Sequence, residues 1–361
     1  MEKYGIVART RALTIVLPLS LLLGIGMVMV YDSSVAEAER LFHNKYYFVE
    51  RHAIWVGLGI LALAFISRVP TSLFQKVGPI FFFGTIVLLF AVLIPGISSR
   101  AQGARRWIRI GSSLSIQPSE IAKLTSVLYL ATWLKQKPKA IHFFALCGLL
   151  VGLLMAQPDF GTAMIMLSTG FLMFFLSGAT SRSLLWSVGA AGLAIAGLIA
   201  VAPYRLQRLT TYFNQSADRL GSGYHINQAL LALGSGGFWG LGLGRSREKF
   251  QYLPEASTDS VFAVIGEEMG FAGASVVIML FAYLFYQLFH IVAREQDDFR
   301  RLMGAGLAGW LAIQVVVNIG AMVALLPLTG VPLPFISYGG SSLIAQLLSV
   351  GIILRIALTQ T

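Results

Sequence analysis

Long apolar segments recur along the whole chain, and short polar stretches separate them. A helix that crosses a bilayer needs about 20 predominantly apolar residues. We expect such helices near residues 12–31, 53–69, 77–95, 117–134, 140–157, 161–178, 184–202, 262–292, 303–327 and 343–358. The pattern therefore predicts an all-α integral membrane protein with about ten transmembrane helices, in a single polytopic domain over residues 1–361.

The composition agrees with a lipid environment. The chain is 56% hydrophobic and only 12% charged, whereas soluble domains carry about 25% charged residues. The first apolar segment ends without a small-residue cleavage site, so we interpret it as a retained span. The single cysteine, Cys147, lies within a predicted span, which excludes a disulfide framework and a cysteine metal cluster. The net charge of +11 comes with no nucleic-acid motif, and we expect no nucleic-acid partner.

An even number of spans places both termini on one side of the membrane. Short basic loops and a basic N-terminus favour the cytoplasm for the termini. The basic residues then divide equally, 13 on each side, and Lys123 within a span completes the 27. The outer cations gather in two extracytoplasmic loops, 96–116 and 203–261. Either long loops cross the membrane regardless of their charge, or these two loops hold an anionic ligand.

The first of these loops, with the span that follows it, contains two groups of charged side chains. Arg105, Arg106 and Trp107 belong to a cationic, amphipathic stretch that suits lipid headgroups or phosphates. Glu120 and Lys123 follow, three residues apart and thus on one helix face, where they can form an ion pair. Charged residues at the edge of a span are costly, which makes the pair a functional candidate, although a purely structural ion pair is the alternative.

Two irregular segments interrupt the spans. Gln157–Thr162 separates two of them, and its Asp159 is suited to cap the next helix. Pro332–Ser342 carries two prolines and paired glycines, which enforce irregular backbone at membrane depth. The second segment is either a cavity wall or a tightly packed turn.

The second outer loop combines glycines with charged residues. Residues 230–244 are too short and too glycine-rich to span, which predicts an interfacial or re-entrant element, and they do not match a phosphate-binding P-loop. Cations and carboxylates then meet at the outer mouth of the eighth span: Arg245, Arg247, Lys249, Glu255 and Asp259. Asp259 could cap that helix or act in catalysis. Glu267 recurs on the same helix face as Asp259, so the two acids could provide base or cation-binding chemistry.

Five motifs, in this order, resemble the SEDS family (shape, elongation, division and sporulation). They are Gly103–Ile108, Gln117–Glu120 with Lys123, Gln157–Thr162, Pro254–Asp259 and Ile336–Ser342. The similarity runs from the first span to the last. Residues 246–256 are more similar to the division member FtsW than to the elongation member RodA. Two departures are Ser257, where many relatives have histidine, and Ser260, where they have phenylalanine.

The resemblance implies a peptidoglycan glycosyltransferase in the cytoplasmic (inner) membrane that polymerises lipid II at the outer face, for septal cell-wall synthesis. It implies a class B penicillin-binding protein as partner, beside other membrane proteins of the divisome. Asp259 corresponds to the family's essential aspartate, and Glu120, Lys123 and Trp107 to its other functional positions.

We accordingly expect Asp259 to act as general base. We expect substrate to contact Trp107, Arg105, Arg106, Glu120, Lys123, Arg245, Arg247, Lys249 and Glu255, with or without a divalent cation such as Mg or Mn. A RodA-like enzyme of elongation is one alternative, and a lipid II flippase or a scaffold without activity are the others. Ionisable residues cluster at the outer mouth rather than along the whole membrane depth, which favours chemistry over transport.

Overall fold

The protein is a bundle of long helices with one small sheet. The computed structural model describes residues 2–96, 98–101, 104–110, 114–137, 139–178, 223–249 and 253–360, together with Gly189 and Gly192. The helices are α1 (Glu2–Phe42), α2 (Tyr47–Ile66), α3 (Thr71–Leu93), α4 (Pro118–Leu134), α5 (Ala140–Ala156), α6 (Phe160–Leu176), α9 (Tyr224–Ser235), α10 (Val261–Ala293), α11 (Asp298–Met322) and α12 (Gly340–Thr359). Each predicted span coincides with a helix except 184–202, which lies outside the described residues apart from the two glycines.

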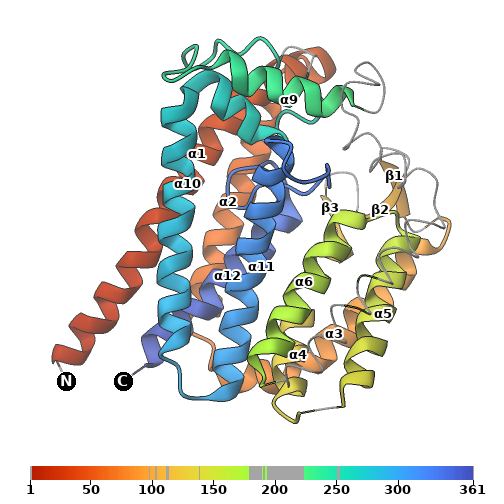
Figure 1. Ribbon diagram of the computed structural model, residues 1–361, viewed down its shortest axis with the longest axis vertical. Coiled ribbons are helices and arrows are strands. Elements are labelled where there is room, and N and C mark those ends of the chain that lie inside the picture. The colour runs from red at the N-terminus through yellow and green to blue at the C-terminus, as the bar shows by residue number, and fades with distance from the viewer. Residues whose placement is uncertain are drawn as a thin grey trace.

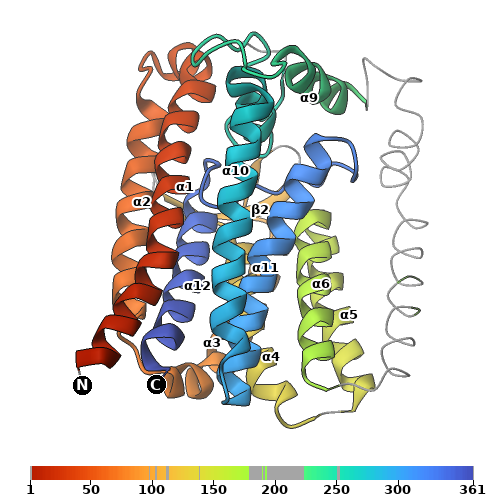
Figure 2. The ribbon, with the colours of Figure 1, turned by 60° about the vertical axis from the view of Figure 1, so that its left-hand side comes forward.

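Both termini lie at the same end of the bundle, and α9 and the sheet lie toward the opposite end (Figures 1 and 2). This arrangement agrees with an even number of crossings. Within the described residues, six helices are long and apolar enough to cross a membrane, and α5 and α6 are shorter apolar helices. The helical membrane architecture is thus confirmed, whereas the count of about ten spans and the side on which the termini lie stay predictions.

Proline sets several helix boundaries. Pro70 occupies the N-cap of α3 with extended backbone, and Ile94, which precedes Pro95, ends the same helix at ψ 124°. Proline disfavours the helical region for the residue before it, which is consistent with the end of α3 at this point, although the same helix accommodates Pro79 in its interior. Pro118 opens α4, where its missing N–H would have no helical partner in any case. Pro118 thus sets the start of α4, two residues before Glu120.

The described residues of the stretch 96–116, which the sequence pattern predicted as an outer loop, include a three-stranded antiparallel sheet. The strands are β1 (Ser98–Ala101), β2 (Ala104–Ile110) and β3 (Leu114–Ile116), in the order β1-β2-β3. Trp107 pairs with Ser99, and Ile108 pairs with Ile116 on the other side. The strand β2, which carries Arg105 and Arg106, contacts α3 and α4.

The helix α10 is broken at Gly270, and the glycine-rich segment 236–242 completes it. Gly270 has φ 67° and ψ −168°, so the regular helical hydrogen bonds fail there. The carbonyl groups of Glu267 and Glu268 accept instead from the amides of Leu241 and Gly242, at 3.0 and 2.9 Å. The amides of Phe271 and Ala272 donate to the carbonyl groups of residues 237 and 238, at 2.9 and 3.0 Å. This pairing explains the glycines, since a Cβ on Gly240 would lie 2.1 Å from the Glu268 carbonyl oxygen.

The element predicted as interfacial or re-entrant is therefore the helix α9 followed by this segment. In Figure 2, α9 lies across the end of the bundle rather than within it. The break also places the residues before Gly270 in a separate helical section, and these residues include both glutamates. The eighth predicted span is thus two sections joined at a kink.

The core lies among α10, α11 and α12, where Trp310 is fully buried. Large apolar side chains cover the outside of the bundle, for example Ile80, Phe65 and Leu61, which are 70, 69 and 68% exposed. Monomeric soluble proteins rarely expose so much contiguous apolar surface. The exposed faces therefore suit contact with lipid tails.

Candidate active site

Glu120 and Lys123 form a buried ion pair on α4. Lys123 Nζ lies 2.9 Å from Glu120 Oε1, and the side chains are 1 and 4% exposed for Lys123 and Glu120 respectively. Lys123 Nζ also donates to Gln314 Oε1 on α11 at 2.8 Å and lies 5.2 Å from the centre of the Trp310 ring. Glu120 Oε2 is buried without a hydrogen-bond partner in the described part of the chain. The predicted pair is thus present, with one oxygen still available as an acceptor.

Two amide side chains on α11 connect this pair to Asp259. Gln314, which holds Lys123, also donates to the Pro332 carbonyl oxygen at 2.9 Å. Asn318, one helical turn further on, donates to the carbonyl oxygens of Asp259 at 2.8 Å and Val331 at 2.7 Å. The sequence analysis missed both amides, although a polar side chain within an apolar span is itself a signal.

Asp259 lies just before α10, at the edge of the protein interior. The N-cap of α10 is Ser260, whose side chain makes no capping hydrogen bond, so Asp259 does not occupy the capping position. The Asp259 residue is 8% exposed, and its Oδ1 lies 3.4 Å from Thr258 Oγ1. The sequence left helix capping and catalysis open for Asp259, and this position does not support helix capping.

The turn before Asp259 is shaped by Glu255. Glu255 has φ 51°, and its carbonyl oxygen accepts from the amides of Thr258 and Ser260, each at 3.1 Å. Its exposed carboxylate accepts from Thr258 Oγ1 at 2.7 Å. Ser260 Oγ donates to the Pro254 carbonyl oxygen at 2.9 Å and lies 2.6 Å from His225 Nε2 on α9. These bonds fix the backbone that presents Asp259.

The segment 329–342 contacts both the turn that carries Asp259 and the start of α4. Gly330 lies beside Asp259, because a Cβ there would be 3.8 Å from Asp259 Oδ2. The amide of Tyr338 donates to the Ser257 carbonyl oxygen at 2.9 Å, and the Gln117 amide donates to Ser341 Oγ at 3.2 Å. Burial raises the pKa of the Tyr338 phenol above its ordinary value, so the hydroxyl stays neutral.

The same segment is a tightly packed turn. Leu333, Phe335 and Ile336 are at most 1% exposed. For these apolar residues, the structure therefore supports a tightly packed turn rather than a cavity wall. The contacts with the Asp259 turn and with the start of α4 are made by the residues on either side of them.

Asp159 caps α6, as predicted. Its Oδ1 accepts from the Thr162 amide at 3.3 Å, and its Oδ2 accepts from Ser119 Oγ at 2.9 Å. Arg106 in β2 donates to the carbonyl oxygens of Gln157 and Pro158 in the same break between spans. Its guanidinium is thus engaged by backbone.

Less is established about the surroundings of Arg105 and Trp107, the two neighbours of Arg106 in β2. The Trp107 side chain is half-buried in β2. Arg105 lies in β2, but its side chain is outside the described part of the structure. The sheet therefore brings Arg106 to the break before α6, and what Arg105 and Trp107 contact stays a prediction.

The basic segment 245–249 is anchored to the two glutamates of α10. Glu268 accepts from the amides of Gly244 and Ser246, and Glu267 accepts from the amide of Arg247. Both glutamates are 1% exposed. They are therefore bound to the loop, which corrects the interpretation that Glu267 could join Asp259 as a second base.

Lys249 is the least accessible of the basic residues in this segment. Its Nζ lies 2.8 Å from Asp32 Oδ2 on α1 and 2.7 Å from Glu268 Oε1. A lysine that pairs with two carboxylates and is almost fully buried is not offered to a substrate in this conformation. The side chains of Arg245 and Arg247 are exposed. Of the three predicted cations, these two are the ones placed to meet an anion.

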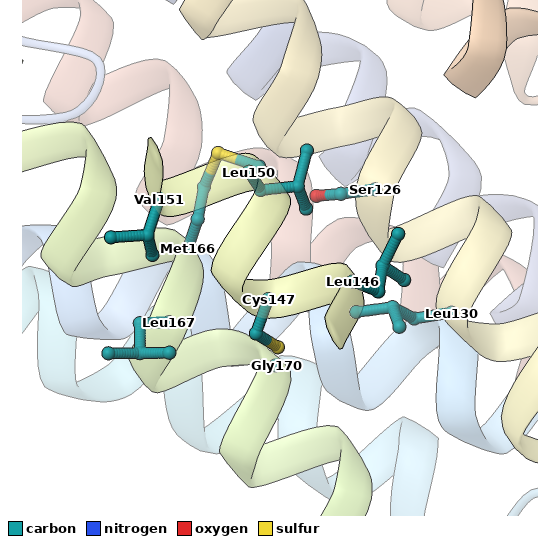
Figure 3. A pocket seen from close by; sticks show the side chains of 9 residues that line it. All are labelled: Ser126, Leu130, Leu146, Cys147, Leu150, Val151, Met166, Leu167 and Gly170. Atoms are coloured by element: carbon teal, nitrogen blue, oxygen red, sulfur yellow. The ribbon is translucent and has the colours of Figure 1, made fainter. Parts of the chain in front are cut away.

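Two further features bear on ligand binding. Within the described ranges, no group of three or more His, Cys, Asp and Glu residues is arranged to hold a metal ion. A cavity of about 10 Å³ lies among α4, α5 and α6, lined mostly by apolar side chains and the Cys147 thiol (Figure 3). That volume is about the minimum for one water molecule, so this cavity is no substrate site.

Comparisons with known proteins agree with the arrangement of these motifs. Residues 12–361 match the family of cell cycle proteins that comprises FtsW, RodA and SpoVE. Stage V sporulation protein E of Bacillus subtilis is 39% identical over 93% of this chain and 94% of its own length. A probable peptidoglycan glycosyltransferase FtsW of Coxiella burnetii is 39% identical over 93% of each chain.

Two solved structures are also similar. A chain from a study of polymerisation and crosslinking by a peptidoglycan synthase complex has a TM-score of 0.80 and 29% identity, covering 95% of this chain and 96% of that one. The rod shape determining protein RodA of Thermus thermophilus has a TM-score of 0.69 and 29% identity, covering 96% of each chain.

Proposed function

Because this chain belongs to the FtsW, RodA and SpoVE family of cell cycle proteins, we propose that it is a peptidoglycan glycosyltransferase that polymerises lipid II. The observation that carries the proposal is that Asn318 binds the Asp259 and Val331 carbonyl groups while Gln314 binds the Pro332 carbonyl group and Lys123, so the Val331–Pro332 backbone links Asp259 to Lys123. It brings motifs far apart in the sequence to one end of the bundle, around an acidic residue at the edge of the interior.

In the proposed reaction, Asp259 takes the proton from a hydroxyl of the acceptor sugar. The hydroxyl oxygen forms a bond to the anomeric carbon of the lipid-linked glycan, and the bond from that carbon to the diphosphate oxygen breaks. The leaving group is undecaprenyl pyrophosphate, on which negative charge develops. Arg245 and Arg247, exposed in the segment that Glu267 and Glu268 anchor, would stabilise that charge electrostatically.

The setting we propose is the outer face of the cytoplasmic (inner) membrane. The protein is a multi-pass membrane protein, and the sheet and α9 lie toward the end opposite the termini. With the termini expected in the cytoplasm, this arrangement supports an outward-facing site. Relatives named FtsW support a role in septal synthesis, whereas the similarity to RodA keeps elongation as the alternative. The structure from a peptidoglycan synthase complex supports a class B penicillin-binding protein as partner, beside other divisome proteins.

The decisive experiment is polymerisation of labelled lipid II by purified protein in detergent, with and without the penicillin-binding partner. We expect glycan chains from the wild type and a loss of about 10²–10⁴-fold in rate for Asp259→Asn. Asp298→Asn is the matched control, because Asp298 is an exposed acid at the end with the termini. Polymer from Asp259→Asn at the wild-type rate would contradict the role of Asp259, and no polymer under any condition would favour a flippase or a scaffold.

A requirement for Mg or Mn is tested in the same assay. The described residues offer no ready-made metal cluster, so we assign no step to a cation. Loss of polymer on adding EDTA, restored by either metal, would support a divalent cation carried by the substrate diphosphate.

A further inference from the structure

A cavity lies at the end of the bundle that holds both termini, far from the proposed active site. Its volume is about 160 Å³, and it is lined by Ile291 and by six residues with polar side chains, namely Arg11, Thr14, Gln287, His290, Arg294 and Gln360. These residues come from α1, from the end of α10 and from the end of α12. The three helices contact one another, and Figures 1 and 2 show their ends beside the two termini.

The cavity carries positive charge that no described acid neutralises. Neither Arg11 nor Arg294 forms an ion pair within the part of the chain that the structure describes. Glu295 follows Arg294 but is buried, with Arg300 Nη2 3.0 Å from its Oε1. The same oxygen accepts from the amides of Gln296 and Asp297, each at 3.0 Å. Glu295 Oε2 accepts from the amide of the lining residue Gln360 at 3.5 Å. Glu295 thus borders the cavity but pairs with Arg300, and the two lining arginines are left for a ligand.

The surface on either side of the cavity is apolar and exposed. Leu13 and Leu17 on α1 are 61 and 62% exposed, and Tyr286 on α10 is 63% exposed. The Tyr286 ring stacks on the His290 ring with centres 5.7 Å apart. Tyrosine is typical of membrane–water interfaces, where its ring meets lipid and its hydroxyl meets water. A basic cavity thus opens beside side chains that suit acyl chains.

We propose that this cavity binds the phosphate headgroup of an anionic phospholipid whose acyl chains lie along α1 and α10. Basic pockets between transmembrane helices are a recognised mode of binding such headgroups. Guanidinium groups bind phosphate through two parallel N–H bonds, and Arg11 and Arg294 approach the cavity from different helices. The Gln287 amide can add a neutral hydrogen bond beside the charge, whereas the Thr14 hydroxyl and the Gln360 amide already donate to the carbonyl oxygens of Arg11 and Ile291, each at 2.8 Å.

The test is native mass spectrometry of the purified full chain in detergent, titrated with phosphatidylglycerol, cardiolipin or phosphatidylcholine. Each basic residue near an anionic lipid contributes about fivefold in affinity, so we expect Arg11→Gln/Arg294→Gln to bind phosphatidylglycerol about 25-fold more weakly. The matched control is Arg68→Gln, which removes an exposed cation at the end of α2. Thermal unfolding without added lipid checks that each variant is folded. If the double variant does not fold, Arg294→Gln alone is tested, and its affinity for phosphatidylglycerol should fall about fivefold.

The results separate the alternatives. Selective binding of the anionic lipids, lost in the double variant and kept in Arg68→Gln, would support the proposal. Equal binding of phosphatidylcholine, or an equal loss in the control, would overturn it. Inorganic phosphate that displaces the lipid at equal concentration would also overturn it, because the site would then be one for free phosphate.

Discussion

Asn318 on α11 donates a hydrogen bond of 2.8 Å to the carbonyl oxygen of Asp259, the residue proposed as general base. The same amide nitrogen donates to the Val331 carbonyl oxygen at 2.7 Å. One buried side chain thus links the backbone of Asp259 to the backbone of Val331. A displacement of about 1 Å at a reacting group can cost about 10²-fold in rate.

We therefore expect Asn318→Leu to lower lipid II polymerisation by about 10- to 100-fold. It should also lower stability, because two buried carbonyl groups lose a donor, at about 1–3 kcal/mol for each unsatisfied group. Polymer yield and the midpoint of thermal unfolding in detergent measure the two effects. Gln346→Leu is the control, since Gln346 is a buried amide that binds Phe335 without touching Asp259. Equal losses of activity in both variants would argue against a positioning role.

The Glu120–Lys123 pair can be separated into structural and functional contributions. Breaking a buried pair by removing one partner costs about 3–5 kcal/mol, so Lys123→Met should be strongly destabilised. Glu120→Gln/Lys123→Met removes both charges and should recover most of that stability. We expect its polymerisation to stay low, because Glu120 Oε2 is then no longer an anionic acceptor. Recovery of activity together with stability would show that the pair is purely structural.

Lys249 should matter for folding more than for substrate affinity. Lys249→Met leaves the buried Glu268 and the half-buried Asp32 without their cation, and we expect a loss of about 3–5 kcal/mol in the free energy of unfolding. Arg301→Met breaks an exposed pair with Asp298 and should cost at most about 1 kcal/mol. Thermal unfolding of the two variants in the same detergent provides the comparison. A Lys249 variant as stable as the Arg301 variant would contradict the anchoring role.

The break in α10 should not tolerate a side chain. A Cβ on Gly270 would lie 2.3 Å from the Gly240 amide nitrogen, and φ 67° disfavours other residues. Gly270→Ala should therefore lower stability and reduce polymerisation, because Glu267 and Glu268 lose their alignment with the basic segment. Gly57→Ala is the control, with no atom within 4 Å of its Cβ, and we expect it to be neutral or stabilising by up to about 1 kcal/mol. Yield, unfolding midpoint and activity compare the two.

Local sequence signals predicted the parts of this structure that depend on local physics. Span positions followed from apolar length, the Asp159 cap from an acid before a helix start, and the Glu120–Lys123 pair from three-residue spacing. The small sheet was missed because the arginine-rich stretch was interpreted by its charge rather than by the alternation of its residues.

Contacts between distant segments were beyond such signals. Lys249 was predicted to bind substrate, but it pairs with Asp32, 217 residues away in the sequence. The partners of Asn318 are backbone carbonyl groups, which carry no side-chain signature. The charged residues of the site could thus be predicted from the sequence, whereas the amide side chains of Asn318 and Gln314 that bind them could not.

The pairing of the glycine-rich segment with α10 has a consequence for biogenesis. A helix broken at Gly270 exposes two carbonyl and two amide groups, each of which costs several kcal/mol in hydrocarbon if left bare. Residues 236–242 leave the ribosome before α10 does, so the groups that cover the break are already synthesised when the helix reaches the membrane. Insertion of α10 and docking of the preceding segment should therefore proceed as one coupled event, with the break held at the water boundary until it is covered.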